Sequence, residues 1–234
     1  MAYRSAGAEE YLEAIYQLGE LGEQATTSKL AEWLDVAPPS VSVMVRRLGE
    51  QGLVHYQPYR PILLTAEGCA RASRLLRRQR LWEVLLYQHL NVPWHQIFEE
   101  ACNLEHGTTE RLESHLASFL AHPSFCPHGY PIPQVDDHVP SLIGVPLSTL
   151  EPGQGSTVRR IPERHGEILK YLESEGIMPG VHLTCLKKAP FDGPVTVRLD
   201  GSPEEERSLP LGCHLAEIII VDPIAQESGS ASSL

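Results

Sequence analysis

The sequence predicts a multidomain α+β protein, with helices in about the first 140 residues and short strands in the remainder. Apolar residues recur at helical spacing through the first part, and two short strand-like runs follow the third expected helix. From about residue 141, β-rich runs alternate with Gly and Pro turns. The 234 residues are 42% hydrophobic and 21% charged, which is enough for two or three domains with cores of their own.

The first 73 residues read as three helices and a pair of strands. Apolar positions in 11–18 follow the i, i+3, i+4, i+7 pattern of a first helix, and Thr27 is the expected N-cap of a second. A third helix is expected over about 39–51, after two prolines that interrupt the second. The runs 53–56 and 62–64 then predict a two-stranded wing around a Pro-containing turn.

A short helix, a tight turn and a helix that opens with small polar residues form a helix-turn-helix pattern. The alternative is a plain packing domain, but the wing directly after the third helix favours DNA binding. The formal charge of −11 argues against non-specific nucleic-acid binding, although a sequence-specific protein with a small basic face can carry it. The candidate DNA-contacting residues are Pro39, Ser40, Ser42, Val43, Arg46, Arg47 and Arg60.

A long helix rich in Leu and Arg is expected after its cap at Thr65, and Pro93 is expected to begin the next helix. That next helix carries EEACNLEH, in which Cys102, Glu105 and His106 lie at i, i+3 and i+4 and share one face. A thiolate, a carboxylate and an imidazole there could bind a divalent transition metal. The alternative is a small buried cysteine beside a solvated Glu–His pair.

A further helix is expected from Thr109 to about Leu120. Three helices with so much Leu, Trp and Phe are too apolar for one small unit, which predicts a dimerisation surface. The segment that follows places Cys126 and His128 on either side of a proline, a weak C-x-H spacing that is often incidental. From Ser141 the pattern is typical of a small β-barrel, with a short helix near 166–173.

Several function classes are disfavoured by the sequence. It has no apolar run long enough to cross a membrane and no signal-peptide pattern at its start, and its five cysteines are scattered, so we expect a cytoplasmic protein. A Cys102–His106 nucleophile pair would make the protein an enzyme, but no oxyanion loop or substrate motif accompanies it. A metal-buffering protein is the other alternative, although it would not need a winged helix.

The combination of these motifs resembles the diphtheria toxin repressor / manganese transport regulator family. The resemblance runs through EYLEAIY, APPSVSVMVRRL, EACNLEH, CPHG and GIMPG, and it covers nearly the whole chain. It implies a homodimeric metal-activated repressor rather than an enzyme, with no small organic substrate. The implied domains are a winged helix-turn-helix at 1–73, a helical dimerisation and metal-binding domain at 74–140 and an SH3-like barrel at 141–225, followed by a disordered tail at 226–234.

The resemblance also implies two metal sites in each protomer. The residues that match the family's core site are Glu10, Glu13, Cys102, Glu105 and His106, with Gln79 in place of the usual histidine. Phe98 stands where iron-type members have a histidine ligand, which excludes that ancillary arrangement. The residues that match the second site of the manganese type are Glu83, Cys126 and His128, with His165 or else Glu167 from the barrel. This second site would fasten the third domain to the helical domain.

Mn(II) is the expected metal, because carboxylates, one imidazole and an amide oxygen suit an ion that prefers oxygen ligands. Cys102 favours Fe(II) or Zn(II), and Fe(II) remains the alternative to Mn(II). A bound cation would relieve the repulsion among the clustered carboxylates and join the first helix to the helical domain. The two recognition helices of the dimer would then meet the half-sites of a pseudo-palindromic DNA operator, which in this family controls genes for manganese or iron transport.

Overall fold

The computed structural model describes residues 7–134, 142–162, 164, 166–200 and 208–223. It divides into two compact units. The first unit holds the described residues up to 126 together with 130–134 and 142, and the second holds 127–129 and the described residues from 143 onward. His165 and the expected disordered tail lie outside the described residues.

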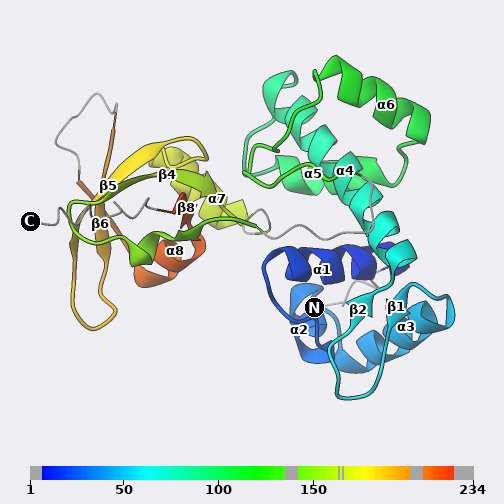
Figure 1. Ribbon diagram of the computed structural model, residues 1–234. Coiled ribbons are helices and arrows are strands. Elements are labelled where there is room, and N and C mark those ends of the chain that lie inside the picture. Colours follow the sequence, from blue (N-terminus) through cyan, green and yellow to red (C-terminus); the bar gives the residue numbers. More distant parts are fainter. Residues whose placement is uncertain (1–6, 135–141, 163, 165, 201–207, 224–234) are drawn as a thin grey trace, which may run out of the picture. The chain divides into compact units, whose positions relative to one another are not determined.

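The first unit begins with a three-helix winged fold, as the sequence predicts (Figure 1). A two-stranded antiparallel hairpin follows the third helix, with Val54 paired to Leu64. Apolar faces of the three helices and the hairpin share one core, in which Leu12, Val41 and Leu48 are fully buried. The elements are α1 (Ala8–Glu20), α2 (Thr27–Trp33), α3 (Pro38–Glu50), β1 (Val54–His55) and β2 (Leu63–Leu64).

The cap of α2 lies one residue earlier than the sequence analysis expects. Thr26 has an extended backbone, and its hydroxyl oxygen accepts the backbone N–H of Lys29 at 3.2 Å, so Thr26 is the N-cap and Thr27 is already helical. Two adjacent threonines have the same capping chemistry, so spacing alone does not choose between them. At the next helix, Pro38 stands at the first helical position, where its missing N–H costs no hydrogen bond.

The rest of the first unit consists of three helices. The hydroxyl oxygen of Thr65 accepts the backbone N–H of Gly68, which confirms the expected cap of the long helix. Pro93, however, does not begin the next helix: its carbonyl accepts the N–H of Gln96 in a turn around the buried Trp94, and helical structure starts only at Ile97. The helices are α4 (Ala66–Gln88), α5 (Ile97–Glu105) and α6 (Glu110–Phe119).

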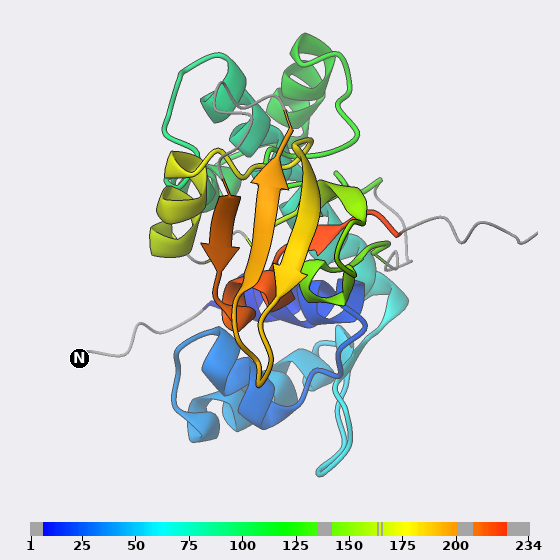
Figure 2. The same cartoon turned by 90° about the vertical axis from the view of Figure 1, so that its left-hand side faces the viewer.

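The second unit is built on a six-stranded sheet of short strands in the order β3-β8-β4-β5-β6-β7. Figure 2 shows β5, β6 and β7 side by side, and the pairing is antiparallel throughout. Burial alternates along β4, as expected for strands with one face in the core. The elements are β3 (Val145–Pro146), η1 (Leu147–Thr149), β4 (Gly155–Arg160), α7 (Gly166–Ser174), β5 (His182–Lys188), β6 (Val195–Leu199), β7 (Ser208–Leu211), α8 (Cys213–Ile218) and β8 (Ile220–Val221).

In the described part of the chain, none of the helices combines the length and the apolar character that a membrane crossing requires.

Candidate metal centres

Glu105, at the end of α5, is the most deeply buried member of the expected core site. Its side chain is 1% exposed, and its Oε2 atom has no hydrogen-bond partner among the described residues. Burial, the nearby charge and hydrogen bond of Glu13 and the charges of Glu9 and Glu83 raise the pKa of Glu105 to about 10. Carboxylates from α1 and α4 therefore lie close enough to Glu105 on α5 to disfavour its ionised form.

The imidazole of His106 lies between two of these carboxylates. Its Nδ1 atom is 3.2 Å from Oε2 of Glu9, and its Nε2 atom is 3.5 Å from Oε1 of Glu105. Arg71 donates to the other oxygen of Glu9 at 2.8 Å, and this guanidinium, aided by His106, holds the pKa of Glu9 below its ordinary value despite partial burial. Glu9 was not among the residues expected from the sequence, although it directly precedes the candidate Glu10.

The remaining core-site candidates differ in burial. Glu10 forms a capping box at the start of α1, where its Oε2 atom accepts the backbone N–H of Gly7 at 3.2 Å. Cys102 is a free, half-buried cysteine on α5. Gln79 is 2% exposed on α4, and its amide nitrogen donates to Oε1 of Glu83 at 2.9 Å. Because a carboxylate oxygen can only accept a hydrogen bond, the Gln79 amide nitrogen must face Glu83. The Gln79 carbonyl oxygen is then turned away from that carboxylate.

These side chains fit a divalent cation. A buried carboxyl oxygen that lacks a partner has an unmet need for a positive charge or a donor, and here further carboxyl groups surround it. The donors available nearby are carboxylate and amide oxygens with one imidazole and one thiol, which are ligand types of Mn(II) and Fe(II). Such a set is better explained by a cation than by packing, which would favour apolar residues.

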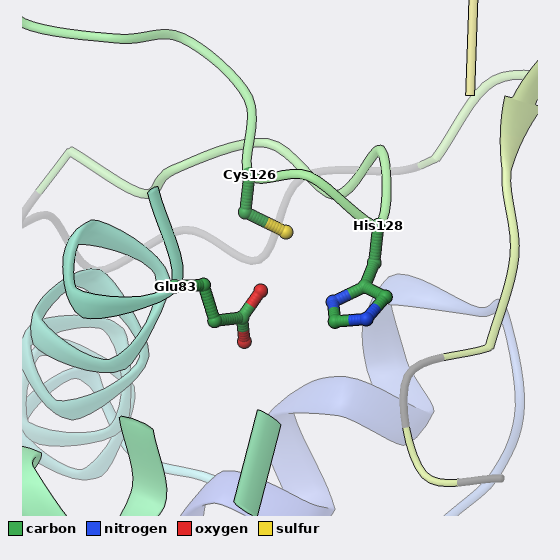
Figure 3. A group of neighbouring side chains, drawn as sticks. All are labelled: Glu83, Cys126 and His128. Atoms are coloured by element: carbon green, nitrogen blue, oxygen red, sulfur yellow. The ribbon is translucent and has the colours of Figure 1, made fainter. Parts of the chain in front are cut away.

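The expected second site is the tightest group of metal-ligand side chains among the described residues (Figure 3). The ligand atoms of Glu83, Cys126 and His128 all lie within 4.8 Å of one another, and all three residues are buried. Glu83 projects from α4, and the other two lie on the loop after α6. Of the expected barrel ligands, His165 is outside the described residues and Glu167 is exposed on α7.

The loop that carries His128 depends on Gly129, which the sequence analysis did not single out. Gly129 has φ of +88°, and a Cβ atom there would overlap the backbone of Arg159 and Arg160. The carbonyl of His128 accepts the backbone N–H of Ile161 at 3.1 Å, so the chain passes very close to the end of β4. A glycine directly after C-P-H was the available signal for this close approach.

The candidate DNA-contacting residues lie on the outer side of the winged fold. Val41, Val45 and Leu48 are buried, which turns the opposite face of α3 outward. Ser42 is half-buried, and its hydroxyl donates to the Pro38 carbonyl at 3.4 Å. The exposed candidates are Pro39, Ser40, Val43, Arg46, Arg47 and, in the wing, Arg60.

A set of large apolar side chains is exposed around α4, α5 and α6. Phe119 is 64% exposed and its ring lies 5.0 Å from that of His89. Leu90, at 58%, lies just beyond the end of α4. The other exposed members are Leu104, Leu112 and Phe125. Exposed apolar side chains of this size are candidates for a surface that a partner covers.

Family models account for the three expected parts of the chain. The N-terminal DNA-binding domain of the iron-dependent repressors matches residues 5–62. Their metal-binding and dimerisation domain matches residues 65–134. The FeoA domain matches residues 145–223.

Two named repressors are similar to this chain in sequence. The diphtheria toxin repressor of Corynebacterium efficiens is 36% identical over 162 residues, which are 69% of this chain and 67% of that protein. The iron-dependent repressor IdeR of Mycobacterium tuberculosis is 38% identical over 125 residues, which span about half of each chain (53% and 54%).

Among solved structures, a manganese-dependent transcriptional repressor in complex with manganese is similar with a TM-score of 0.84 and 32% identity, over 93% of this chain and 100% of that one. The manganese regulator SloR gives a TM-score of 0.75 with 32% identity, over 96% and 100%. The chain belongs to the iron-dependent repressor family, which comprises iron- and manganese-dependent transcriptional repressors such as the diphtheria toxin repressors.

Proposed function

We propose that the protein is a homodimeric repressor that Mn(II) activates to bind a pseudo-palindromic operator of metal-uptake genes, in the cytoplasm. The observation that carries the proposal is the carboxyl cluster around Glu105. Glu13 comes from α1 of the winged fold, and Glu105 comes from α5 of the helical region. A cation held there would bind the DNA-binding part to the dimerisation part, and this is the coupling that a metal-activated repressor needs.

The core ligands in this proposal are Glu10, Glu13, Cys102, Glu105 and His106, with the carbonyl oxygen of Gln79 as a further candidate. A divalent cation supplies positive charge that offsets the repulsion among these groups. Glu13 and Glu105 would then hold α1 against α5 with both carboxyl groups ionised. Glu9 holds His106 through its Nδ1 atom, which leaves Nε2 directed toward Glu105 and the cluster.

The second site consists of Glu83, Cys126 and His128, so each protomer would take two ions. Gln79 supports this site by holding Glu83 with its amide nitrogen. A ligand from the third domain, His165 or Glu167, would complete the coordination. A donor set with thiolate and imidazole accepts several transition metals, so this site contributes less to metal selectivity than the core site.

The preference for Mn(II) rests on the oxygen-rich core and on the similarity to a manganese-bound repressor. Fe(II) is the alternative, because Cys102 is a softer ligand and the similar proteins of known sequence include iron-dependent repressors. Raw affinity ranks Mn(II) below Fe(II) at a given site, so geometry and metal availability have to decide between them.

Dimerisation is assigned to the exposed apolar residues of the helical region, Leu90, Leu104, Leu112, Phe119 and Phe125. They fall within the segment that matches the dimerisation domain of the family. In the dimer the two copies of α3 would enter successive major grooves. Arg46, Arg47 and Arg60 would contact phosphates, while Val43 contacts thymine methyl groups at most.

The test is fluorescence anisotropy of metal-stripped protein with DNA from upstream of its own gene, at fixed salt. Mn(II) and, under anaerobic conditions, Fe(II) are titrated separately. We expect tight DNA binding only when metal is present. The Mn(II) concentration that produces it should be lower than the Fe(II) concentration. A lower threshold for Fe(II) would move the protein to the iron-responsive branch, and binding without metal would refute metal activation.

A further inference from the structure

Two of the expected core ligands lie where a helix ends. Glu105 is the last residue of α5, and His106 is its C-cap. The last carbonyl groups of a helix have no partner within the helix, and its final turn frays easily. Because α5 has only nine residues, its own length does little to hold these two side chains in place. A well-ordered core site therefore needs contacts that fix this end of α5 from outside the helix.

The common glycine ending is not used at this end. Many helices end with a glycine of left-handed backbone directly after the C-cap, and Gly107 stands at that position. The backbone of Gly107 does not adopt the left-handed conformation. The final carbonyls of α5 are therefore satisfied in another way.

Thr108 caps the end of α5 with both its backbone and its side chain. Its backbone N–H donates to the carbonyl of Glu105 at 2.9 Å, and its hydroxyl donates to the carbonyl of Leu104 at 2.9 Å. One residue thus satisfies two carbonyls of the last turn. Thr108 is 3% exposed, so its hydroxyl is shielded from water. The cap joins the backbone of both neighbouring residues to one fixed side chain.

Trp82 on α4 holds the hydroxyl of Thr108. Its indole Nε1–H donates to Oγ1 of Thr108 at 2.7 Å. An indole N–H can only donate, whereas a hydroxyl both accepts and donates. The hydroxyl therefore accepts from Trp82 and directs its single hydrogen to the carbonyl of Leu104. Because the indole also packs against the apolar cluster that contains Leu81 and Val84, Trp82 is a well-fixed donor.

The contact of Glu9 with His106 fixes a different part of the same turn. Oε2 of Glu9 lies 3.2 Å from Nδ1 of His106, so it orients the ring. Thr108 instead holds the backbone that carries the ring and the carboxyl group of Glu105. Orientation of the ring places Nε2 correctly only if the backbone beneath it is also held.

We propose that Trp82 and Thr108 are positioning residues for the core metal site, because they fix the end of α5 that carries two of its ligands. The inference rests on the proposed function, in which Glu105 and His106 bind the metal. Ligands that are already in place lose little conformational freedom when the cation binds, so less of the binding energy is spent on ordering them. Neither Trp82 nor Thr108 is itself a ligand.

The test is the Mn(II) affinity of Thr108→Val, measured by competition with a metal-binding dye. All proteins carry Cys126→Ser/His128→Ala, which removes two ligands of the second site so that the core site dominates the titration. Valine keeps the shape of threonine and removes only the hydroxyl. We expect Thr108→Val to weaken Mn(II) binding about tenfold, which is typical for a residue that orients a ligand. Thr108→Ser restores the hydroxyl and should stay within about twofold of the background protein.

Thr109→Val is the matched control. Thr109 is exposed, and its hydroxyl oxygen accepts the backbone N–H of Leu112 at 3.3 Å at the start of α6. This change also removes a helix cap, but the helix concerned carries none of the expected core ligands. Mn(II) affinity should therefore stay within about twofold of the background protein. Equal losses of affinity in Thr108→Val and Thr109→Val would overturn the proposal, as would an undiminished affinity in Thr108→Val.

Trp82→Phe tests the other member of the pair, and it replaces Thr108→Val if that protein does not fold. Phenylalanine keeps an aromatic ring but has no N–H, so Mn(II) binding should weaken by about threefold or more. The two changes should not add, because each removes the same hydrogen bond. Fully additive losses in Trp82→Phe/Thr108→Val, or a Trp82→Phe protein with unchanged affinity, would contradict a joint role.

The indole N–H of Trp82 gives a readout that does not depend on metal. Proton–nitrogen NMR detects the indole N–H signals of the three tryptophans, and Trp82→Phe identifies the signal of Trp82. This signal should move in Thr108→Val and stay in place in Thr109→Val. A signal that is indifferent to Thr108→Val would overturn the contact on which the proposal rests. A background protein that binds no Mn(II) would instead refute the core site, and with it the proposed function, before any change at Trp82 or Thr108 is made.

Discussion

The side-chain amide of Gln79 donates to a carboxylate oxygen of Glu83 at 2.9 Å, one helical turn further along α4. These two residues belong to different candidate metal sites, so one hydrogen bond links the two sites. The charge of Glu83 also contributes to the raised pKa of Glu105. The amide nitrogen therefore supports Glu83, and in the proposed assignment the amide oxygen is the group available to the core site.

Replacing Gln79 with histidine should tighten binding of Fe(II) more than binding of Mn(II). An imidazole nitrogen is a better ligand than an amide oxygen for the later metals of the divalent series, and a change of this kind is worth about tenfold in affinity. Competition titrations with a metal-binding dye measure both affinities. Gln79→Leu is the control, because it offers neither donor nor acceptor and should weaken both metals. Equal tightening of the two metals in Gln79→His would contradict a role for position 79 in selectivity.

Metal binding at the core site should release a proton from Glu105 near neutral pH. Burial first, and the charge of Glu13 second, raise the pKa of this carboxyl above its ordinary 4.5, so it holds a proton that a cation must displace. Affinity should therefore rise with pH throughout the window between 4.5 and the raised pKa. Calorimetry in buffers of different ionisation enthalpy counts the proton, in a Cys102→Ser background so that this thiol does not contribute. Binding without proton release would contradict the raised pKa.

Glu105→Gln should abolish metal-dependent DNA binding while the dimer survives. The amide keeps the size of the side chain but removes the charge that a divalent cation requires, and Glu105 is buried whereas the apolar residues assigned to the dimer are exposed. Anisotropy follows DNA binding, and light scattering follows the mass of the dimer. A normal metal response in this variant would refute the core-site assignment.

His128→Ala should weaken the second site and leave part of the activation. The imidazole is one of three clustered ligands, and its loss leaves the core residues untouched. Isothermal titration should show one tight metal per protomer in place of two, and DNA binding should need more metal. A complete loss of DNA binding would reverse the ranking of the two sites.

Gly129→Ala should destabilise the protein and disturb the second site together. The added methyl group would meet the backbone of Arg159 and Arg160, at a φ of +88° that L-residues rarely adopt. The expected loss is about 1–3 kcal/mol of unfolding free energy, measured by urea denaturation. Gly153→Ala is a suitable control, since it also has positive φ but its Cβ would meet nothing within 4 Å. Equal losses in both variants would show that the close approach at Gly129 is unimportant.

The sequence predicted those features that depend on local pattern. The third helix near 39–51 and the cap at Thr65 follow from proline placement and capping chemistry, and the structure has both. The change from helical spacing to short β-rich runs near residue 141 also predicts a helical first part and a sheet-based second part. The start of α5 at Ile97 could not be placed, because Pro93 suits a turn as well as a helix start.

Contacts between segments that are distant in the chain could not be predicted from sequence patterns. Glu9 and His106 are far apart in the chain, as are Glu20 and Arg80, and no spacing rule brings them together. Arg80 is one of five arginines between positions 71 and 80, and composition alone does not show that this one is fully buried. The cluster of Glu83, Cys126 and His128 was expected only through the family resemblance, since C-x-H by itself is a weak signal.

The length of α4 means that a small rotation at one end displaces the other end by a larger distance. Its 23 residues form one continuous helix that begins directly after the wing and carries Glu83 near its far end. From Ala66 to Glu83 the helix axis runs about 26 Å at 1.5 Å per residue, so a tilt of about 5° at the metal end moves the wing by roughly 2 Å. A small displacement at the metal end would thereby be magnified at the wing. In the proposed symmetric dimer both wings would move, so the distance between the two DNA contacts would change by up to twice that amount.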